Sequence, residues 1–134
     1  NQLRHVRYLK DRANTISLMK RHAEIMRPKF EMVLKMLRKE LTNRGIAHWH
    51  HPTGGYFISL NTYPGTAKRA LALCQQAGVT MTAAGATFPY GIDPRDRNLR
   101  LAPTYPSDAD LESAAKVLCI AVRLATLEKL LQKA

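Results

Sequence analysis

The chain has 134 residues, of which 46% are hydrophobic and 23% are charged, and its formal net charge is +11. This length and composition predict one folded domain and exclude a disordered or fibrous chain. No apolar run reaches the roughly eighteen residues that a transmembrane helix needs, so we expect no membrane contact. Residues 1–44 hold twelve of the 21 basic residues and only four acidic ones, so most of the excess charge belongs to one segment.

A basic segment of this kind could bind nucleic acid by neutralising phosphates. Residues 1–44, however, show neither interleaved aromatic residues nor a recognisable RNA- or DNA-binding motif. The alternatives are a solvated helix face and a face that meets an acidic partner domain in a longer chain. We expect one of these two, and nucleic-acid binding is the less favoured hypothesis.

The first predicted element is a long amphipathic helix over residues 13–44. Its apolar residues recur at spacings of three and four between Ile16 and Leu41. Pro28 lies inside this stripe without shifting its phase, so we expect one kinked helix rather than two. The preceding residues also have a helical tendency, but they carry too few apolar side chains to indicate what they pack against.

Two short β-prone runs follow within residues 46–60, and the sequence between them, 52–55, contains a proline and two glycines that suit a tight reversal. We therefore expect an antiparallel hairpin. Residues 66–77 then have the pattern of a helix, with Thr66 as its N-cap and Gly78 as its left-handed stop.

Residues 79–102 predict short strands at 79–83 and from residue 98 onward, joined by a glycine- and proline-rich loop of the length that is usually functional or mobile. Residues 107–132 predict a C-terminal helix capped by Ser107. The order α-β-β-α-β-β-α predicts an α/β (α+β) sandwich, in which helices pack on a small mixed or antiparallel sheet.

Two further features concern the cellular compartment. Cys74 and Cys119 fall in helical patterns among apolar residues, which is typical of buried reduced thiols. Residues 1–10 contain no apolar core followed by a small-residue cleavage site, so no secretory signal is predicted. The reduced thiols favour a cytoplasmic protein, and the chain could begin inside a longer protein.

The sequence contains few residues arranged as a metal site or a catalytic nucleophile would require. His48 and His50 would share one face of a strand while His51 points away, which supplies two ligands where zinc requires three or four. No serine or cysteine stands in a strand-to-helix turn beside a base, and the glycines form no nucleotide-binding motif. We predict neither a metal site nor a catalytic nucleophile.

Arg100 is the most informative polar residue, because it interrupts an apolar strand-like run, 99–102. Strand alternation places Arg100 on the face opposite to Leu99 and Leu101, beside Asn98. If this face meets solvent, the arginine needs no function. If it lines a cleft, the planar guanidinium offers a bidentate fork to a carboxylate. The residues alone leave both alternatives open.

Three segments in this order are similar to a known family: residues 52–60 (PTGGYFISL), 74–91 (CQQAGVTMTAAGATFPYG) and 98–118 (NLRLAPTYPSDADLESAAKVL). With the preceding helix, they resemble the C-terminal small domain of fold-type I pyridoxal-phosphate (PLP) aminotransferases. The nearest branch is the one that contains the type Ic aspartate aminotransferases, also called MocR-like. The resemblance spans nearly the whole chain.

In that family, the arginine of the strand before the last helix binds the substrate α-carboxylate, and the matching residue is Arg100. The resemblance therefore favours the cleft. It also implies that the GGYF segment and the AGATFPYG loop lie near the mouth of the active site. The substrate-binding candidates are Arg100, Asn98, Gly55, Tyr56, Phe88 and Tyr90.

The resemblance also implies what this chain lacks. Family members join PLP to a lysine of the large domain, and no lysine here has that context. We expect a homodimeric parent transaminase that uses aspartate or a related amino acid with 2-oxoglutarate, and whose large PLP-binding domain lies outside this chain. Alone, the chain is expected to be inactive. The alternative is a free-standing module that binds nucleic acid or senses amino acids.

Overall fold

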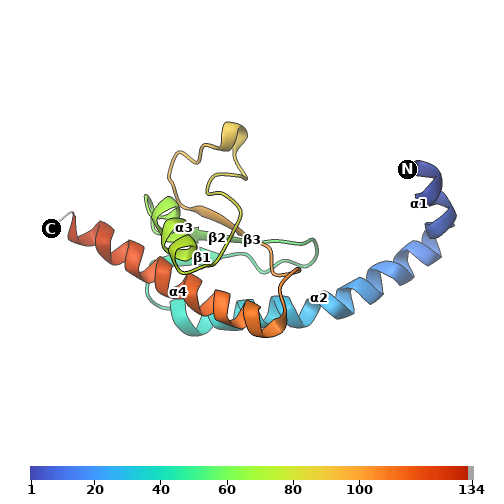
Figure 1. Cartoon of the computed structure of the whole chain (residues 1–134), viewed down its shortest axis with the longest axis horizontal. Coiled ribbons are helices and arrows are strands. Elements are labelled where there is room, and N and C mark those ends of the chain that lie inside the picture. Colours follow the sequence, from blue (N-terminus) through green and yellow to red (C-terminus); the bar gives the residue numbers. More distant parts are fainter. Residues whose placement is uncertain (133–134) are drawn as a thin grey trace.

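In the computed structural model, which describes residues 1–132, helices pack against one face of a three-stranded sheet (Figure 1). The elements are α1 (Gln2–Leu9), α2 (Arg12–Leu41), β1 (Ala47–Trp49), β2 (Ile58–Thr62), α3 (Ala67–Gln76), the 3-10 turn η1 (Pro89–Gly91), β3 (Asn98–Leu101) and α4 (Asp108–Leu131). The predicted fold class, helices on a small sheet, is confirmed, and the sheet is antiparallel throughout.

The strand order is β1-β2-β3, so β2 is the central strand. β1 and β2 form the predicted antiparallel hairpin, in which Trp49 pairs with Leu60. The reversal between them is not tight, because the connection occupies residues 50–57. Within this connection, residues 53–56, which include both glycines, form consecutive bends rather than a two-residue turn.

The expectation of a strand over residues 79–83 is wrong. Val79 and Met81 do pack against the hydrophobic core, so the alternation that suggested a strand reflects real burial. The segment has no strand partner among the described residues, and a cavity of about 250 Å³ lies between it and the end of β3. Alternating burial produces an extended segment, but a strand also requires a ladder of hydrogen bonds.

α2 runs through Pro28 as a single helix, as the unbroken apolar stripe predicts. It begins one residue earlier and ends three residues earlier than expected, and Asp11 caps it by accepting a hydrogen bond of 2.8 Å from the Asn14 N–H. α1 and the first half of α2 extend away from the sheet (Figure 1). The first buried residue of α2 is Val33, and α1 has none.

The hydrophobic core joins the second half of α2 to the sheet, α3 and α4. Its fully buried large side chains include Leu37 of α2, Ile58 and Leu60 of β2, and Leu99 of β3. The two cysteines are free and buried, as predicted, and burial raises the pKa of Cys74 to about 11. Across residues 1–132, none of the helices combines the length and apolarity that crossing a bilayer would require.

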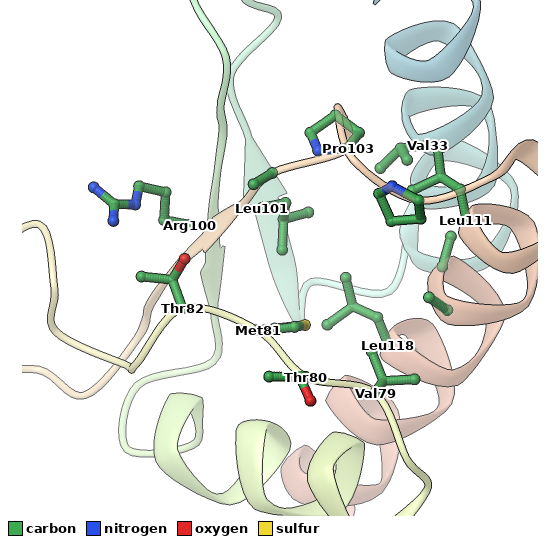
Figure 2. Close-up of a pocket in the computed structure, with 14 residues that line it drawn as sticks. Val33, Val79, Thr80, Met81, Thr82, Arg100, Leu101, Pro103, Leu111 and Leu118 are labelled. Carbon is green, nitrogen blue, oxygen red and sulfur yellow. The ribbon is translucent and has the colours of Figure 1, made fainter.

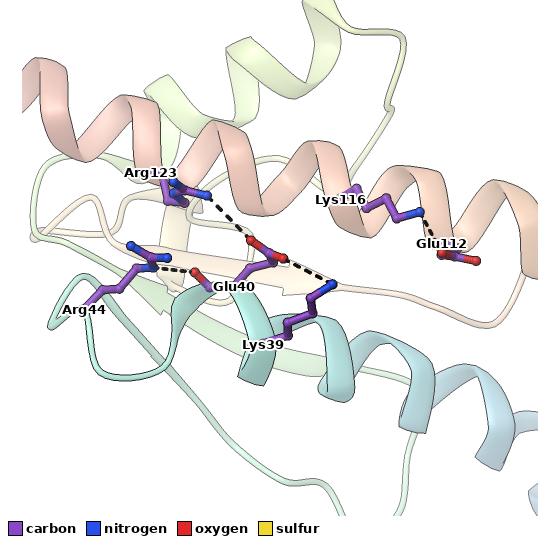
Figure 3. A network of polar contacts seen from close by, with 6 residues as sticks. All are labelled: Lys39, Glu40, Arg44, Glu112, Lys116 and Arg123. Atoms are coloured by element: carbon purple, nitrogen blue, oxygen red, sulfur yellow. Dashed lines mark hydrogen bonds and ion pairs between the residues drawn. The ribbon is translucent and has the colours of Figure 1, made fainter.

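One ion pair crosses between α2 and α4 on the outside of the molecule, and others lie within each helix (Figure 3). Arg123 of α4 lies 3.6 Å from the carboxylate of Glu40, whose backbone carbonyl accepts a hydrogen bond of 2.8 Å from Arg44 Nε. Lys116 and Glu112 form an i,i+4 pair at 2.7 Å within α4. These side chains are substantially exposed, so each pair contributes at most about 1 kcal/mol, and apolar packing dominates the α2–α4 contact.

One of the two predicted N-caps is confirmed. Ser107 accepts a hydrogen bond from the Asp110 N–H and so caps α4 as expected. Thr66 occupies the N-cap position of α3, but its hydroxyl donates to the Tyr63 carbonyl at 2.6 Å instead of capping. The carboxylate that caps α3 belongs to Asp96, which accepts from the Lys68 N–H at 3.0 Å.

Candidate functional site

The sheet face opposite the helices is polar. The antiparallel register places Ser59 opposite Arg100, Asn61 opposite Asn98, and His48 opposite Asn61. Because alternate residues of a strand share a face, these five side chains lie on one surface, while their apolar neighbours face the core. The segment between α3 and β3 meets this surface, since the Thr87 hydroxyl donates a hydrogen bond of 2.7 Å to Asn98.

Arg100 is half-buried on β3 and is held by an aromatic ring. Its guanidinium carbon lies 4.5 Å from the centroid of the Phe57 ring, a cation–π contact. Its Nε is buried without a hydrogen-bond partner, and none of the four ion pairs within residues 1–132 includes it. An arginine that is held in place yet lacks an acidic partner is a candidate receptor for an anion.

The cavity of about 250 Å³ lies beside Arg100 and is mainly apolar. Arg100 is its one charged lining residue among those described. Figure 2 shows the Arg100 side chain extending away from Leu111 and Leu118, which form the opposite part of the lining. The guanidinium therefore belongs to the polar sheet face, and the apolar cavity lies behind it.

Asn98 joins three parts of the structure. Its amide group donates to Ser59 Oγ at 2.9 Å and to Asn61 Oδ1 at 3.0 Å, and its Oδ1 accepts from Thr87. Both amide hydrogens are therefore used within the protein. This arrangement ties β3 to β2 and to the preceding loop, and it leaves Asn98 no free donor for a ligand.

The GGYF segment lies next to Arg100, although its members differ in what they contact. Gly55 has a φ of +83°, which favours glycine, and Tyr56 is about half exposed. The residue that touches Arg100 is Phe57, which is not among the candidates predicted from the sequence. A usable signal exists, because a register that pairs Ser59 with Arg100 also places Phe57, two residues before Ser59, on the same face.

The loop candidates lie elsewhere. Phe88 is 37% exposed and lines a second cavity, of about 330 Å³. Tyr90 is 99% exposed, has a φ of +58° and lines neither cavity. The structure thus brings Arg100, Asn98 and the GGYF segment together, whereas Phe88 and Tyr90 line no cavity in common with Arg100.

The second cavity is lined by His48, Asn61, Phe88, Asp93, Pro94, Arg95 and Arg97. His48 does not act as one of a pair of metal ligands here, because its ring nitrogens lie 3.1 Å from Arg97 and 3.2 Å from Asn61. His51 contacts Arg38 instead. Within the described residues, no three His, Cys, Asp or Glu side chains gather as a metal site would require.

Comparison with known proteins gives consistent matches over the chain. A family described as aspartate amino-transferase matches residues 1–134. A protein of Mycolicibacterium smegmatis, provisionally named an aminotransferase, is 47% identical over 131 residues, which cover 98% of this chain and 31% of that protein. The crystal structure of an aspartate transaminase from Corynebacterium glutamicum superposes with a TM-score of 0.90 at 43% identity, over 96% of this chain and 30% of that one.

A more distant structure shares the fold alone. The α-aminoadipate aminotransferase of Thermus thermophilus, solved with N-(5'-phosphopyridoxyl)-L-leucine, matches 78% of this chain with a TM-score of 0.67 at 18% identity. The chain therefore spans less than a third of the length of the relatives that it matches.

Proposed function

Because the chain belongs to the aspartate aminotransferase family, we propose that it is the small domain of a PLP-dependent transaminase, in which Arg100 binds the α-carboxylate of the substrate. The observation that carries this proposal is the guanidinium of Arg100, stacked on Phe57 and without an acidic partner. The substrates are aspartate, or a related amino acid, and 2-oxoglutarate. The family match does not favour a free-standing nucleic-acid-binding or amino-acid-sensing module.

The contribution of Arg100 is to orient the substrate. A planar guanidinium accepts a carboxylate through two parallel hydrogen bonds, which fixes the direction of the adjacent Cα. The Phe57 ring limits the conformations of the Arg100 side chain, so less entropy is lost when the carboxylate binds. Asn98 acts as a positioning residue, because its hydrogen bonds join β3 to β2 and to Thr87.

Gly55, Tyr56, Phe88 and Tyr90 remain proposed contacts of the substrate or of the closed active site. Tyr56 is adjacent in sequence to Phe57, and Gly55 sets the backbone direction of the same connection. Phe88 and Tyr90 belong to the loop that meets the polar sheet face through Thr87, and Phe88 lines the second cavity.

PLP supplies the electron sink for amino-group transfer in such enzymes. The described residues do not fit the cofactor by themselves, because neither cavity has a lysine among its lining residues. We therefore place PLP and its lysine in the part of the parent protein that lies outside this chain. The Thermus thermophilus structure with a phosphopyridoxyl ligand, which shares the fold, supports the choice of cofactor.

The first half of α2 presents an apolar surface on which the missing part of the parent protein can pack. The apolar stripe of α2 is buried from Val33 onward, but it continues toward the N-terminus through Met19, which is 64% exposed, and Ile16. Apolar side chains in register with a buried stripe favour a further packing partner. We propose that this partner is the large PLP-binding domain of the same parent protein. We also expect the parent protein to be homodimeric, MocR-like and cytoplasmic. The free cysteines of this chain agree with a cytoplasmic location.

The test is the Arg100→Gln substitution in the parent enzyme, assayed with aspartate and 2-oxoglutarate. Loss of a charge-assisted pair of about 1.5–3 kcal/mol lowers kcat/KM by about 10- to 150-fold. Arg100→Lys keeps the charge but not the fork, so we expect an intermediate loss. Turnover by the 134-residue chain alone is expected to be absent.

The matched control is Arg69→Gln, which removes an arginine bonded to Glu128 at 2.6 and 2.7 Å, at the contact of α3 with α4. Its kcat/KM should stay near that of the wild type. Full activity of the Arg100→Gln enzyme would refute the role of Arg100, and a parent that transaminates no amino acid would refute the function.

A further inference from the structure

The two buried side-chain polar atoms without a hydrogen-bond partner in the described part of the chain are both arginine Nε atoms, those of Arg97 and Arg100. Each of these arginines lines a different cavity. Buried donors are nearly always satisfied, so an unpaired one indicates a missing ligand or water. The substrate carboxylate accounts for Arg100 in the proposed function, whereas nothing yet accounts for Arg97.

Side chains that carry nitrogen dominate the polar part of the cavity of about 330 Å³ that Arg97 lines. Arg95, Arg97, His48 and Asn61 all contribute to its lining. The described ion pairs include neither arginine. Arg97 makes one side-chain hydrogen bond, from its terminal nitrogen to His48 Nδ1 at 3.1 Å, which keeps the two side chains together without neutralising the guanidinium.

The one acidic residue in the lining, Asp93, is occupied by the backbone. Its carboxylate accepts hydrogen bonds from the N–H groups of Arg95 (2.9 Å), Arg97 (2.8 Å) and Asn98 (2.8 Å). Asp93 thus shapes the loop around the cavity and leaves the guanidinium groups of Arg95 and Arg97 without a direct carboxylate contact. The lining carries two fixed positive charges against this single negative one.

We propose that this cavity binds a small oxyanion, a carboxylate or a phosphate group, between Arg97 and Arg95, while His48 holds the Arg97 side chain in place. Guanidinium donors suit oxygen atoms that carry negative charge. Phe88 and Pro94 complete the lining with apolar surface. A cavity of this size accommodates a small organic acid or phosphate ester.

The proposed oxyanion site is separate from Arg100. The lining reaches His48 on β1, two strands away from β3, and neighbouring strands are about 4.8 Å apart. Asn98 lies between Arg100 and this site, and its amide group is fully used within the protein. The two cavities share no lining residue, and anion binding at Arg97 can be measured without turnover, so this inference does not depend on the proposed transaminase activity.

The experiment is a titration of the 134-residue chain with inorganic phosphate at constant ionic strength, followed by NMR through the arginine Nε–Hε signals. Saturable movement of the Arg97 signal is expected, because its unpaired Nε gains an acceptor. Parallel titrations with acetate and methyl phosphate show whether carboxylates or phosphates bind more tightly.

Three variants assign the binding. Arg97→Gln should weaken phosphate binding at least tenfold, and Arg97→Lys should weaken it less, which keeps the test valid if the first variant folds poorly. Arg100→Gln should leave the affinity unchanged, and so should the control Arg69→Gln, whose arginine is already paired with Glu128.

Non-saturating shifts spread over the exposed basic residues would overturn the proposal, since they indicate only attraction to a positively charged surface. Unchanged affinity in both Arg97 variants would overturn it as well. Loss of binding in Arg100→Gln would show that the anion occupies the substrate site instead. None of these results depends on whether the parent is a transaminase.

Discussion

At the scale of single residues, the conformation of the loop before β3 depends on Asp93. This side chain is 9% exposed, and it accepts hydrogen bonds from three backbone N–H groups of the following five residues. Burial opposes its ionisation, but these bonds and the charge of Arg97 outweigh burial, so the pKa of Asp93 lies below its ordinary value. One carboxylate thereby positions Arg97, Asn98 and the start of β3.

This geometry predicts a pH-dependent stability. A carboxyl group with a lowered pKa in the folded state stabilises that state above its unfolded pKa of about 3.9, and the contribution is lost as pH falls through the folded pKa. Asp93→Asn should lower the free energy of unfolding by about 1–3 kcal/mol at pH 7, because an amide cannot accept all three bonds. Urea denaturation at pH 7 and at about pH 3 measures the effect.

The difference between Asp93→Asn and wild type should shrink at the lower pH, where the wild-type carboxyl group begins to protonate. Asp108→Asn serves as the control, because Asp108 is exposed in the first turn of α4. A constant difference at both pH values would contradict the role given to the ionised carboxylate.

At the scale of elements, the start of α3 is capped by a residue that is distant in sequence, Asp96. The backbone carbonyl of Asp96 accepts from the N–H groups of Gly65, Thr66 and Ala67, and its side chain accepts from Lys68. The free N–H groups at the start of this helix are therefore satisfied by the loop that precedes β3. This contact joins the start of α3 to the same loop that carries Arg97.

Asp96→Ala should accordingly destabilise the chain by about 0.5–2 kcal/mol, the usual cost of losing a capping side chain. Asp96 also has a φ of +43°, a conformation that asparagine tolerates better than alanine, so Asp96→Asn should be close to wild type. Chemical denaturation followed by circular dichroism distinguishes the two. Equal stability of the alanine variant and wild type would show that the backbone carbonyl alone caps α3.

At the scale of the whole molecule, the chain is packed unevenly along its length. The second half of α2 contributes Leu37 and Leu41 to the core, whereas the first half and α1 bury no residue. The apolar stripe runs through both halves of α2, but only the second half packs against the hydrophobic core of this chain. A surface of this kind is expected where the rest of a larger protein packs.

A pair of substitutions on one helix tests this difference. Leu37→Ala should lower the free energy of unfolding of the 134-residue chain by about 2–5 kcal/mol, because Leu37 is fully buried. Met19→Ala, on the same stripe, should change it by no more than about 0.5 kcal/mol, because Met19 is 64% exposed. Urea denaturation measures both, and a large loss for Met19→Ala would mean that the stripe of α2 packs along its full length within this chain.

Much of the fold could be predicted from local patterns. Apolar spacing predicts α2, α3 and α4 within three residues of their observed ends, and alternation predicts the β1–β2 hairpin and β3. The missing strand at residues 79–83 shows the limit of this reasoning. Alternating burial is a property of a segment, whereas strand pairing depends on a neighbour at hydrogen-bonding distance, and here a cavity lies between the two.

For the site, strand alternation is enough to predict that Arg100 faces away from the apolar side of its strand, and the family resemblance points to a carboxylate ligand. Three features become visible in the folded chain alone: Phe57 supports the guanidinium, Asn98 has no free donor, and Arg97 and His48 share a second cavity. These two kinds of feature differ in how far apart in the sequence the residues that set them lie. Side-chain direction follows from strand geometry over neighbouring residues, whereas contacts between residues such as His48 and Arg97 arise only when the chain folds.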